Sequence, residues 1–158
     1  MSNKIKTIGI GADHRGYQLK EKLKAFLIKH NYQVIDFGVN SEDRADYPLI
    51  AFELSNHILG VKNPKPPFIK YGILICGSGI GMSISANKVK GIRAALCLLP
   101  DMAVRARQHN NANVLVLPAE FVSFAKAKKI IEVFLKEKFL KGRYQIRNQQ
   151  ILEYENKN

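Results

Sequence analysis

The feature that most constrains the fold of this chain is a regular alternation of short apolar runs and amphipathic stretches, with Gly, Asp or Asn at the junctions. Apolar runs of this length are typical of strands buried on both faces, and amphipathic stretches with a helical repeat are typical of helices. We predict strands over residues 5–11, 34–37, 72–76, 93–98 and 114–117. We predict helices over residues 15–30, 46–58, 82–88, 100–108, 121–138 and 143–154.

Strands that alternate with helices predict an α/β fold, with a parallel sheet of about five strands covered by helices on both faces. The chain of 158 residues fits one such domain, residues 1–158. Residues 62–68 contain three prolines and predict a surface loop. The last helix has few apolar positions, so we expect it to pack on something other than its own core, with a partner subunit as one candidate. Because ligands of parallel sheets bind beyond the carboxyl ends of the strands, the residues at those ends are the site candidates.

The composition narrows the function. A formal net charge of +12 raises a nucleic-acid-binding alternative, because clustered Lys and Arg neutralise phosphates. The cations are instead spread along the predicted helices, which favours a solvated surface and leaves a smaller share to steer an anionic substrate. Cys76 and Cys97 lack the spacing of a zinc or redox pair and suit a reducing compartment. With no long apolar run and no signal-peptide pattern, we expect a cytoplasmic protein that binds neither membrane nor nucleic acid.

The first predicted strand ends in Gly11-Ala12-Asp13-His14. Gly9 and Gly11 could begin a dinucleotide-binding fingerprint, but its third glycine would fall at His14, so a nucleotide cofactor is disfavoured. Asp13 taken alone is explained as a helix N-cap. His14 is a stronger site candidate, because this strand end faces the expected cleft.

The central motif is Cys76-Gly77-Ser78-Gly79-Ile80-Gly81, directly after a strongly apolar strand. Its glycines let the backbone N–H groups converge, and the helix that follows adds partial positive charge. Such a nest can bind phosphate or stabilise an oxyanion. We expect the positive potential to favour the thiolate of Cys76 and to make it a usable base, with the Ser78 hydroxyl beside it. The alternative is that Cys76 is the last core residue of a buried strand, which is how we interpret Cys97.

Two further groups have more than one interpretation. His109 lies between a predicted helix and a strand, where it could interact with the helix dipole or act as an acid–base group. Arg143 and Arg147 are four residues apart on one helix and project from one face. They could form a phosphate clamp or belong to a solvated surface.

These motifs occur in the order found in the type B ribose-5-phosphate isomerases, and the sequence resembles that family, which also holds the lactose-pathway galactose-6-phosphate isomerases. The resemblance covers nearly the whole chain. It implies a Rossmann-like three-layer fold and an isomerase that uses no cofactor and no metal. It further implies a homodimer or dimer of dimers, with active sites built from two subunits and the C-terminal helix at the subunit interface. The matching segments are Asp13-His14, Asp46-Tyr47-Pro48, residues 72–81, Ala86-Asn87-Lys88, Gly91-Ile92-Arg93, His109-Asn110 and Gly142-Arg143 with Arg147.

The resemblance also implies catalytic roles. Cys76 would take the C2 proton of the open-chain sugar phosphate and return it to C1, and Ser78 would help to move the hydroxyl proton. The nest from Gly77 to Gly81 would stabilise the cis-enediolate. His109, with help from Asp13, would open the furanose ring.

The remaining matches concern substrate binding. By the same resemblance, Tyr47 and Asn110 would contact the sugar. His14, Arg143 and Arg147 would hold the phosphate, the arginines reaching from the partner subunit.

The sequence departs from the family pattern at a few positions. Glu120 stands where many relatives carry an arginine near the phosphate site, and a carboxylate there repels phosphate unless it points away. Tyr144 replaces a histidine, and residues 63–68 lengthen a loop. Some members use a helix glutamate as the base; here that position is Met82 and the cysteine is present, so we expect the cysteine mechanism.

The leading hypothesis is therefore the interconversion of ribose 5-phosphate and ribulose 5-phosphate in the non-oxidative pentose phosphate pathway. Isomerisation of a six-carbon sugar phosphate, such as allose or galactose 6-phosphate, is the nearest alternative. The galactose enzymes work as two unlike subunits, whereas a chain with both Cys76 and His109 carries the full set of groups, which favours ribose. A non-catalytic module that binds phosphosugars or nucleic acid is the alternative from another class.

Overall fold

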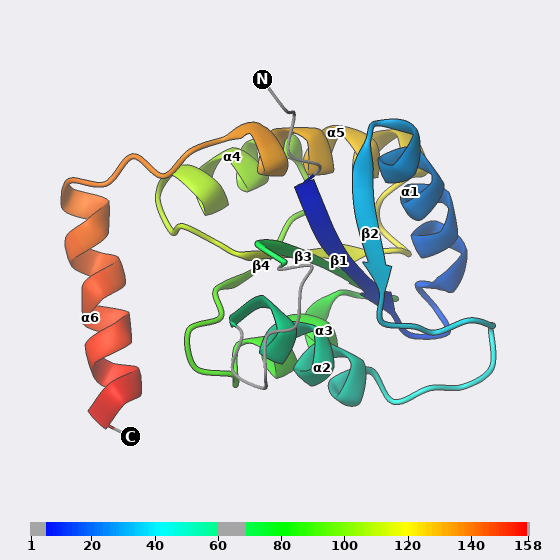
Figure 1. The fold of residues 1–158 in the computed structure, drawn as a ribbon, viewed down its shortest axis with the longest axis horizontal. Coiled ribbons are helices and arrows are strands. Elements are labelled where there is room, and N and C mark those ends of the chain that lie inside the picture. Colours follow the sequence, from blue (N-terminus) through cyan, green and yellow to red (C-terminus); the bar gives the residue numbers. More distant parts are fainter. Residues whose placement is uncertain (1–5, 60–68, 158) are drawn as a thin grey trace.

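The computed structural model describes residues 6–59 and 69–157 and has a three-layer α/β arrangement (Figure 1). The strands are β1 (Lys6–Ala12), β2 (Tyr32–Asp36), β3 (Tyr71–Cys76), β4 (Ala94–Leu96) and β5 (Val114–Pro118). The helices are α1 (Tyr17–Lys29), α2 (Tyr47–Leu59), α3 (Ile80–Ala86), α4 (Pro100–Gln108), α5 (Phe124–Lys136) and α6 (Arg143–Lys157). The predicted alternation of strands and helices is confirmed.

Within the described residues, five strands form one sheet in the order β2-β1-β3-β5-β4, and all neighbouring strands are parallel. The chain moves to one side of β1 to form β2 and then to the other side to form β3, so the direction of winding reverses between β1 and β3. Ala12 pairs with Ile75 at the carboxyl ends of these two strands. A reversal of this kind opens a crevice between the two strand ends, which is where ligands of such sheets bind. The topology therefore brings the turn after β1 next to the turn after β3.

Each face of the sheet has its own core. Helices α1, α4 and α5 cover one face, and α2 and α3 cover the other (Figure 1). Because successive side chains of a strand point to opposite faces, Ile73 and Ile75 of β3 enter the first core, and Leu74 and Cys76 enter the second. Cys76 is therefore a core residue of the α2–α3 side as well as the last residue of β3.

Two helices begin two or three residues later than predicted, for local reasons. α5 begins at Phe124 rather than at residue 121, because the Ser123 hydroxyl caps it by accepting a hydrogen bond from an amide of the first turn at 3.2 Å. α1 begins at Tyr17 rather than at residue 15, because the Asp13 carboxylate holds the preceding residues in a separate turn. A single sequence shows the helical period well but not which nearby hydroxyl or carboxylate fixes the first turn.

Helix α6 lies beyond the β4 edge of the sheet, at the end of an extended segment (Figure 1). Asn148 is the one residue of Arg143–Lys157 that is buried, whereas Ile146, Ile151 and Tyr154 are exposed. This helix therefore buries no apolar residue of its own, and the prediction that it packs on something else, such as a partner subunit, stays a prediction. The predicted loop at 62–68 lies outside the described residues.

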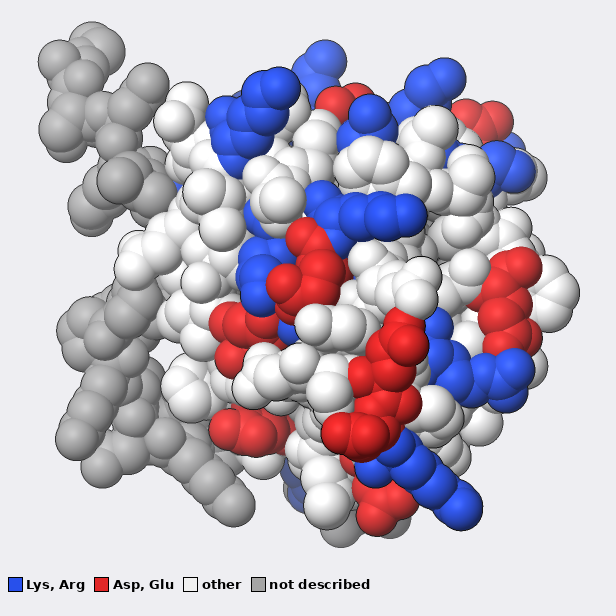
Figure 2. All heavy atoms as spheres, turned by 90° about the vertical axis from the view of Figure 1, so that its right-hand side faces the viewer, with Lys and Arg blue, Asp and Glu red and all other residues white. Residues whose placement is uncertain are grey.

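The surface mixes charges of both signs. Figure 2 shows cationic and acidic side chains side by side on the face that carries α1 and β2. Part of this face is a cluster in which Lys20 and Lys24 each lie within 2.8 Å of Glu21 and Asp36. Burial raises the pKa of Asp36, but hydrogen bonds from both lysines and from the Gly38 amide outweigh burial, and the net pKa is lowered. No helix within residues 6–59 and 69–157 has the length and apolarity to cross a membrane.

Candidate active site

Three turns meet at the carboxyl edge of the sheet. The Asp13 amide, after β1, donates to the carbonyl of Ile75 in β3 at 3.2 Å. The amides of Ala119 and Glu120, after β5, donate to the carbonyls of Cys76 and Gly77 at 2.9 and 3.0 Å. These bonds fix the turn after β3 between the turns of its two neighbouring strands.

The Cys76 thiol lies at the centre of this junction. Its Sγ accepts a hydrogen bond from the Gly79 amide at 3.2 Å, and the amides of Gly81 and Met82 also point to it. The residue is only 4% exposed, so the thiol is almost completely buried within one chain. The predicted convergence of main-chain N–H groups is confirmed, and in the structure they converge on the sulfur itself.

The predicted direction of the thiol pKa is wrong for the single chain. Burial raises the pKa of Cys76, and the nearby Asp13 carboxylate adds to the rise. The amides of Met82, Gly79 and Gly81 lower the pKa but do not outweigh burial. The prediction considered only the amides, which lower the thiol pKa. The cost of removing a thiolate from water raises the pKa and is the larger effect here.

The glycines of the nest are required by geometry at two positions. Gly79 has φ of +76°, in the left-handed region that favours glycine, and it precedes the first turn of α3. A Cβ at Gly81 would lie 2.6 Å from the Tyr47 ring, so the absence of a side chain lets Tyr47 pack directly on the nest. The Ser78 hydroxyl accepts a hydrogen bond from the Ile80 amide at 3.3 Å, which leaves its own proton available to donate.

Asp13 and His14 lie on the turn after β1, and the Asp13 carboxylate is close enough to the thiol to affect its pKa. The Asp13 carboxylate is buried and accepts hydrogen bonds from the Arg15 and Gly16 amides, each at 3.0 Å. This is the capping role that the sequence suggested, applied to the turn that precedes α1. His14 Nδ1 accepts a hydrogen bond from the Ala45 amide at 3.4 Å, so its Nε2 carries the proton and can donate to a ligand.

His109 and Asn110 lie at the amino-terminal ends of the parallel strands, opposite the carboxyl ends where Cys76 lies. They follow α4 and precede β5, whereas Cys76 pairs in register with Pro118 at the far end of β5. The strand from Val114 to Pro118 alone spans about 13 Å. The structure therefore brings Asp13, His14, Tyr47 and the nest together, and it separates His109 and Asn110 from them within one chain.

Arg143 and Arg147 belong to the same distant group as His109. The His109 ring stacks on Tyr144 of α6 at 4.2 Å between centroids and 8° between planes. Arg143 donates to the Tyr144 hydroxyl at 3.0 Å, and both arginines are exposed. The Asn148 side chain donates to the His109 carbonyl at 3.1 Å. His109, Asn110 and the two arginines thus form a second cluster, joined through α6.

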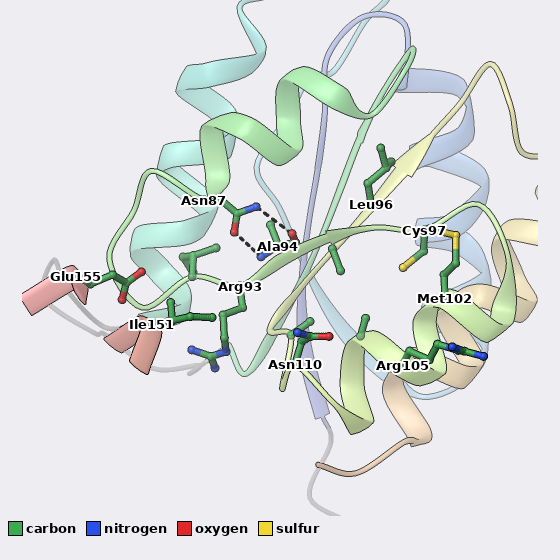
Figure 3. A pocket seen from close by; sticks show the side chains of 14 residues that line it. Asn87, Arg93, Ala94, Leu96, Cys97, Met102, Arg105, Asn110, Ile151 and Glu155 are labelled. Atoms are coloured by element: carbon green, nitrogen blue, oxygen red, sulfur yellow. Dashed lines mark hydrogen bonds between the residues drawn. The ribbon is translucent and has the colours of Figure 1, made fainter. Parts of the chain in front are cut away.

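A cavity of about 600 Å³ lies between β4, α4 and α6, near this second cluster (Figure 3). Asn87 binds the edge of β4 there, because its side chain accepts from the Ala94 amide and donates to the Ala94 carbonyl, both at 2.9 Å. Asn110 lines the cavity, and Cys97 contributes its sulfur to the wall. Burial raises the pKa of Cys97 to about 12, which agrees with its interpretation as a core residue.

Arg15 is a functional candidate that the sequence analysis missed. Its guanidinium forms an ion pair with the Glu120 carboxylate. The Glu120 carboxylate is therefore neutralised by Arg15, which comes from the turn after β1. The sequence alone did not decide whether this carboxylate would repel a phosphate. No pattern in the sequence links residues 15 and 120; only the parallel register of β1, β3 and β5 brings their turns together.

Fold and site together define the class of the protein. It is a parallel α/β protein with a candidate polar site at the carboxyl ends of the strands, where a thiol is surrounded by main-chain amides near a carboxylate. In an α/β sheet of this topology, the crevice at the reversal of winding is the place where small polar ligands bind.

Comparison with known proteins identifies the family. Residues 8–151 match the Ribose/Galactose Isomerase family. The chain is 39% identical over 151 residues to ribose-5-phosphate isomerase B of Escherichia coli (strain K12), covering 96% of this chain and 97% of that one. The chain therefore belongs to the ribose/galactose isomerase family and is a sugar phosphate isomerase.

Solved structures of relatives share the whole fold. The structure of Clostridium thermocellum ribose-5-phosphate isomerase B aligns with a TM-score of 0.90 at 42% identity, covering 96% of this chain and 98% of that one. The structure of ribose-5-phosphate isomerase B from Mycoplasma genitalium, with bound ribulose-5-phosphate, aligns with a TM-score of 0.88 at 39% identity, covering 96% and 97%. The predicted Rossmann-like α/β fold is confirmed.

Proposed function

We propose that the protein is a cytoplasmic ribose-5-phosphate isomerase that interconverts D-ribose 5-phosphate and D-ribulose 5-phosphate. The observation that carries the proposal is the Cys76 thiol, held at the strand ends by the amides of Gly79, Gly81 and Met82 with Asp13 nearby. The ribulose-5-phosphate bound to the Mycoplasma genitalium relative supports a five-carbon substrate.

The chemistry requires a base and a means to stabilise negative charge. Hydrogen at C2 is only weakly acidic, so its removal needs a positioned base and donors aimed at the oxygens of the enediolate. Cys76 takes the proton from C2 and returns it to C1, while Ser78 moves the hydroxyl proton between the oxygens. The amides of Gly79, Gly81 and Met82 stabilise negative charge on the sulfur before transfer and on the enediolate after it.

Ring opening and phosphate binding require groups from both clusters. Asp13 and His14 lie at the carboxyl edge, and His109, Arg143 and Arg147 lie at the other edge of the same chain. One molecule cannot close that separation, since it is built into the register of β5. We therefore propose a homodimer or dimer of dimers in which the nest of one chain faces the His109 cluster of its partner.

The substrate is tested by coupled assays with purified sugar phosphates. We expect kcat/KM for ribose 5-phosphate to exceed that for allose 6-phosphate and galactose 6-phosphate by about 10-fold or more. A site shaped for a five-carbon sugar phosphate has to accommodate one additional carbon in either six-carbon substrate. Initial rates at several concentrations of each sugar phosphate give the three values. A larger kcat/KM for a six-carbon substrate would overturn the assignment and leave the family membership intact.

The raised thiol pKa makes a prediction about pH. A base acts in its deprotonated form, so a raised pKa of Cys76 means that the active thiolate is scarce at neutral pH and accumulates as pH rises. We expect kcat/KM to rise steadily between about pH 7.5 and about pH 9, above the titration of ordinary histidines. Initial rates in buffers of constant ionic strength measure the profile. A rate that stays flat across this interval would show that the base is already ionised and would contradict the prediction.

A further inference from the structure

Arg15 and Glu120 meet directly over the nest. A Cβ at Gly77 would lie 2.8 Å from Glu120 Oε1 and 3.1 Å from Arg15 Nε. The side chains come from the turns on either side of the Cys76 turn and form an ion pair across it. The pair therefore lies against the backbone of the nest at Gly77.

The pair contributes little to holding the fold together. The Arg15 side chain is 62% exposed and that of Glu120 is 41% exposed. Exposed ion pairs contribute little to stability, because water screens the charges and the side chains lose entropy. A position over the nest, combined with high exposure, is better suited to contact with a ligand.

The surroundings of the pair carry charges of both signs. A cavity of about 440 Å³ beside the nest is lined by both members of the pair and by His14 and Lys22. Glu42, which accepts a hydrogen bond from Gln18, also lines it. With Arg15 present, the Glu42 and Glu120 carboxylates are balanced by Arg15 and Lys22. Without Arg15, the two carboxylates would be balanced by Lys22 alone, and a phosphate dianion would be repelled.

We propose that Arg15 is a ligand for the phosphate of the substrate and that Glu120 orients its guanidinium over Gly77. This inference rests on the proposed function for the identity of the substrate. A guanidinium has five N–H donors in a planar fork, so Arg15 can bind Glu120 with part of the fork and phosphate with the rest. Arg15 also neutralises Glu120, which allows a carboxylate to stand beside a phosphate.

The test measures binding of inorganic phosphate to the full chain by calorimetry, which does not depend on turnover. We expect Arg15→Ala to weaken phosphate binding by about 10- to 100-fold, the range for loss of a hydrogen bond between charged groups. Glu120→Gln in the Arg15→Ala background removes the unbalanced carboxylate, and we expect it to recover about 3- to 10-fold of the loss. Lys136→Ala is the matched control, because it removes one exposed cation from the last turn of α5, at the other end of the sheet; we expect a change below about 2-fold.

Unchanged phosphate affinity in Arg15→Ala would overturn the proposal, as would a double variant that binds no better than Arg15→Ala. A loss that Lys136→Ala reproduces would also overturn it, since it would reflect net charge alone. With ribose 5-phosphate, the loss in Arg15→Ala should fall more on KM than on kcat, whereas a disturbed nest would lower kcat. If the unaltered protein binds phosphate but does not turn over ribose 5-phosphate, the proposed function fails, and the assignment of Arg15 is still decided by the calorimetry.

Discussion

Replacing Cys76 with alanine is expected to lower kcat for ribose 5-phosphate by about 10²- to 10⁴-fold, the range for loss of a general base. The sulfur is the group on which the amides of Gly79, Gly81 and Met82 converge, so no other side chain of the nest can take its place. Ser78 is adjacent, but its hydroxyl accepts from the Ile80 amide and is a far weaker base. Exchange of the C2 hydrogen with deuterated water, followed by NMR, measures the same step independently of product formation.

Cys97→Ala is the matched control for this variant. Cys97 is equally buried, but it lines the cavity next to β4 and lies outside the nest. Both variants lose one small buried side chain, so we expect a similar loss of stability, about 1 kcal/mol. Only Cys76→Ala should lose turnover, and it should still bind ribose 5-phosphate. Turnover that survives in Cys76→Ala, or that disappears equally in Cys97→Ala, would exclude Cys76 as the base.

The sequence predicts this part of the molecule well because local signals agree. The apolar strand before Cys76 and the glycines after it mark one strand end, and Asp13 marks its neighbour. Parallel strands gather such ends at one edge, so the pairing of the two turns follows from fold class alone. The structure confirms both the turn and the convergence of its amides.

Other features depend on distances that no sequence pattern carries. The sign of the Cys76 pKa shift depends on the balance between burial and hydrogen bonds, and only coordinates give both. The Arg15–Glu120 pair joins residues from two distant turns. The position of His109 could have been predicted, because a residue in the loop before a strand of a parallel sheet lies at the amino-terminal end of the strands, opposite the ligand crevice. The resemblance to known isomerases assigned His109 and Cys76 to the same reaction. It did not say whether the two residues of one active site come from the same chain.

That separation leads to a prediction about mixtures of inactive variants. Cys76→Ala and His109→Ala are each expected to be inactive as homodimers, because every site lacks one essential group. In a hybrid dimer, one site combines the native Cys76 of one chain with the native His109 of the other. Co-expression of the two chains with different affinity tags, followed by purification on both tags, should give hybrids with about half the wild-type turnover per dimer.

The control for this experiment is a mixture of Cys76→Ala and Asp13→Asn chains. Cys76 and Asp13 lie at the same edge of the same chain, so each site of this hybrid takes one altered residue and neither site is complete. We therefore expect no recovery from this pair, and recovery only from the pair whose residues lie at opposite edges. If the doubly tagged Cys76→Ala/His109→Ala hybrid stays inactive, each chain uses its own His109, and the register of β5 in this structure would have to change for the site to form. Recovery in both hybrids would instead mean that a site with Asp13→Asn is still active, whereas recovery in the Cys76→Ala/His109→Ala hybrid alone shows that the partner chain supplies the imidazole.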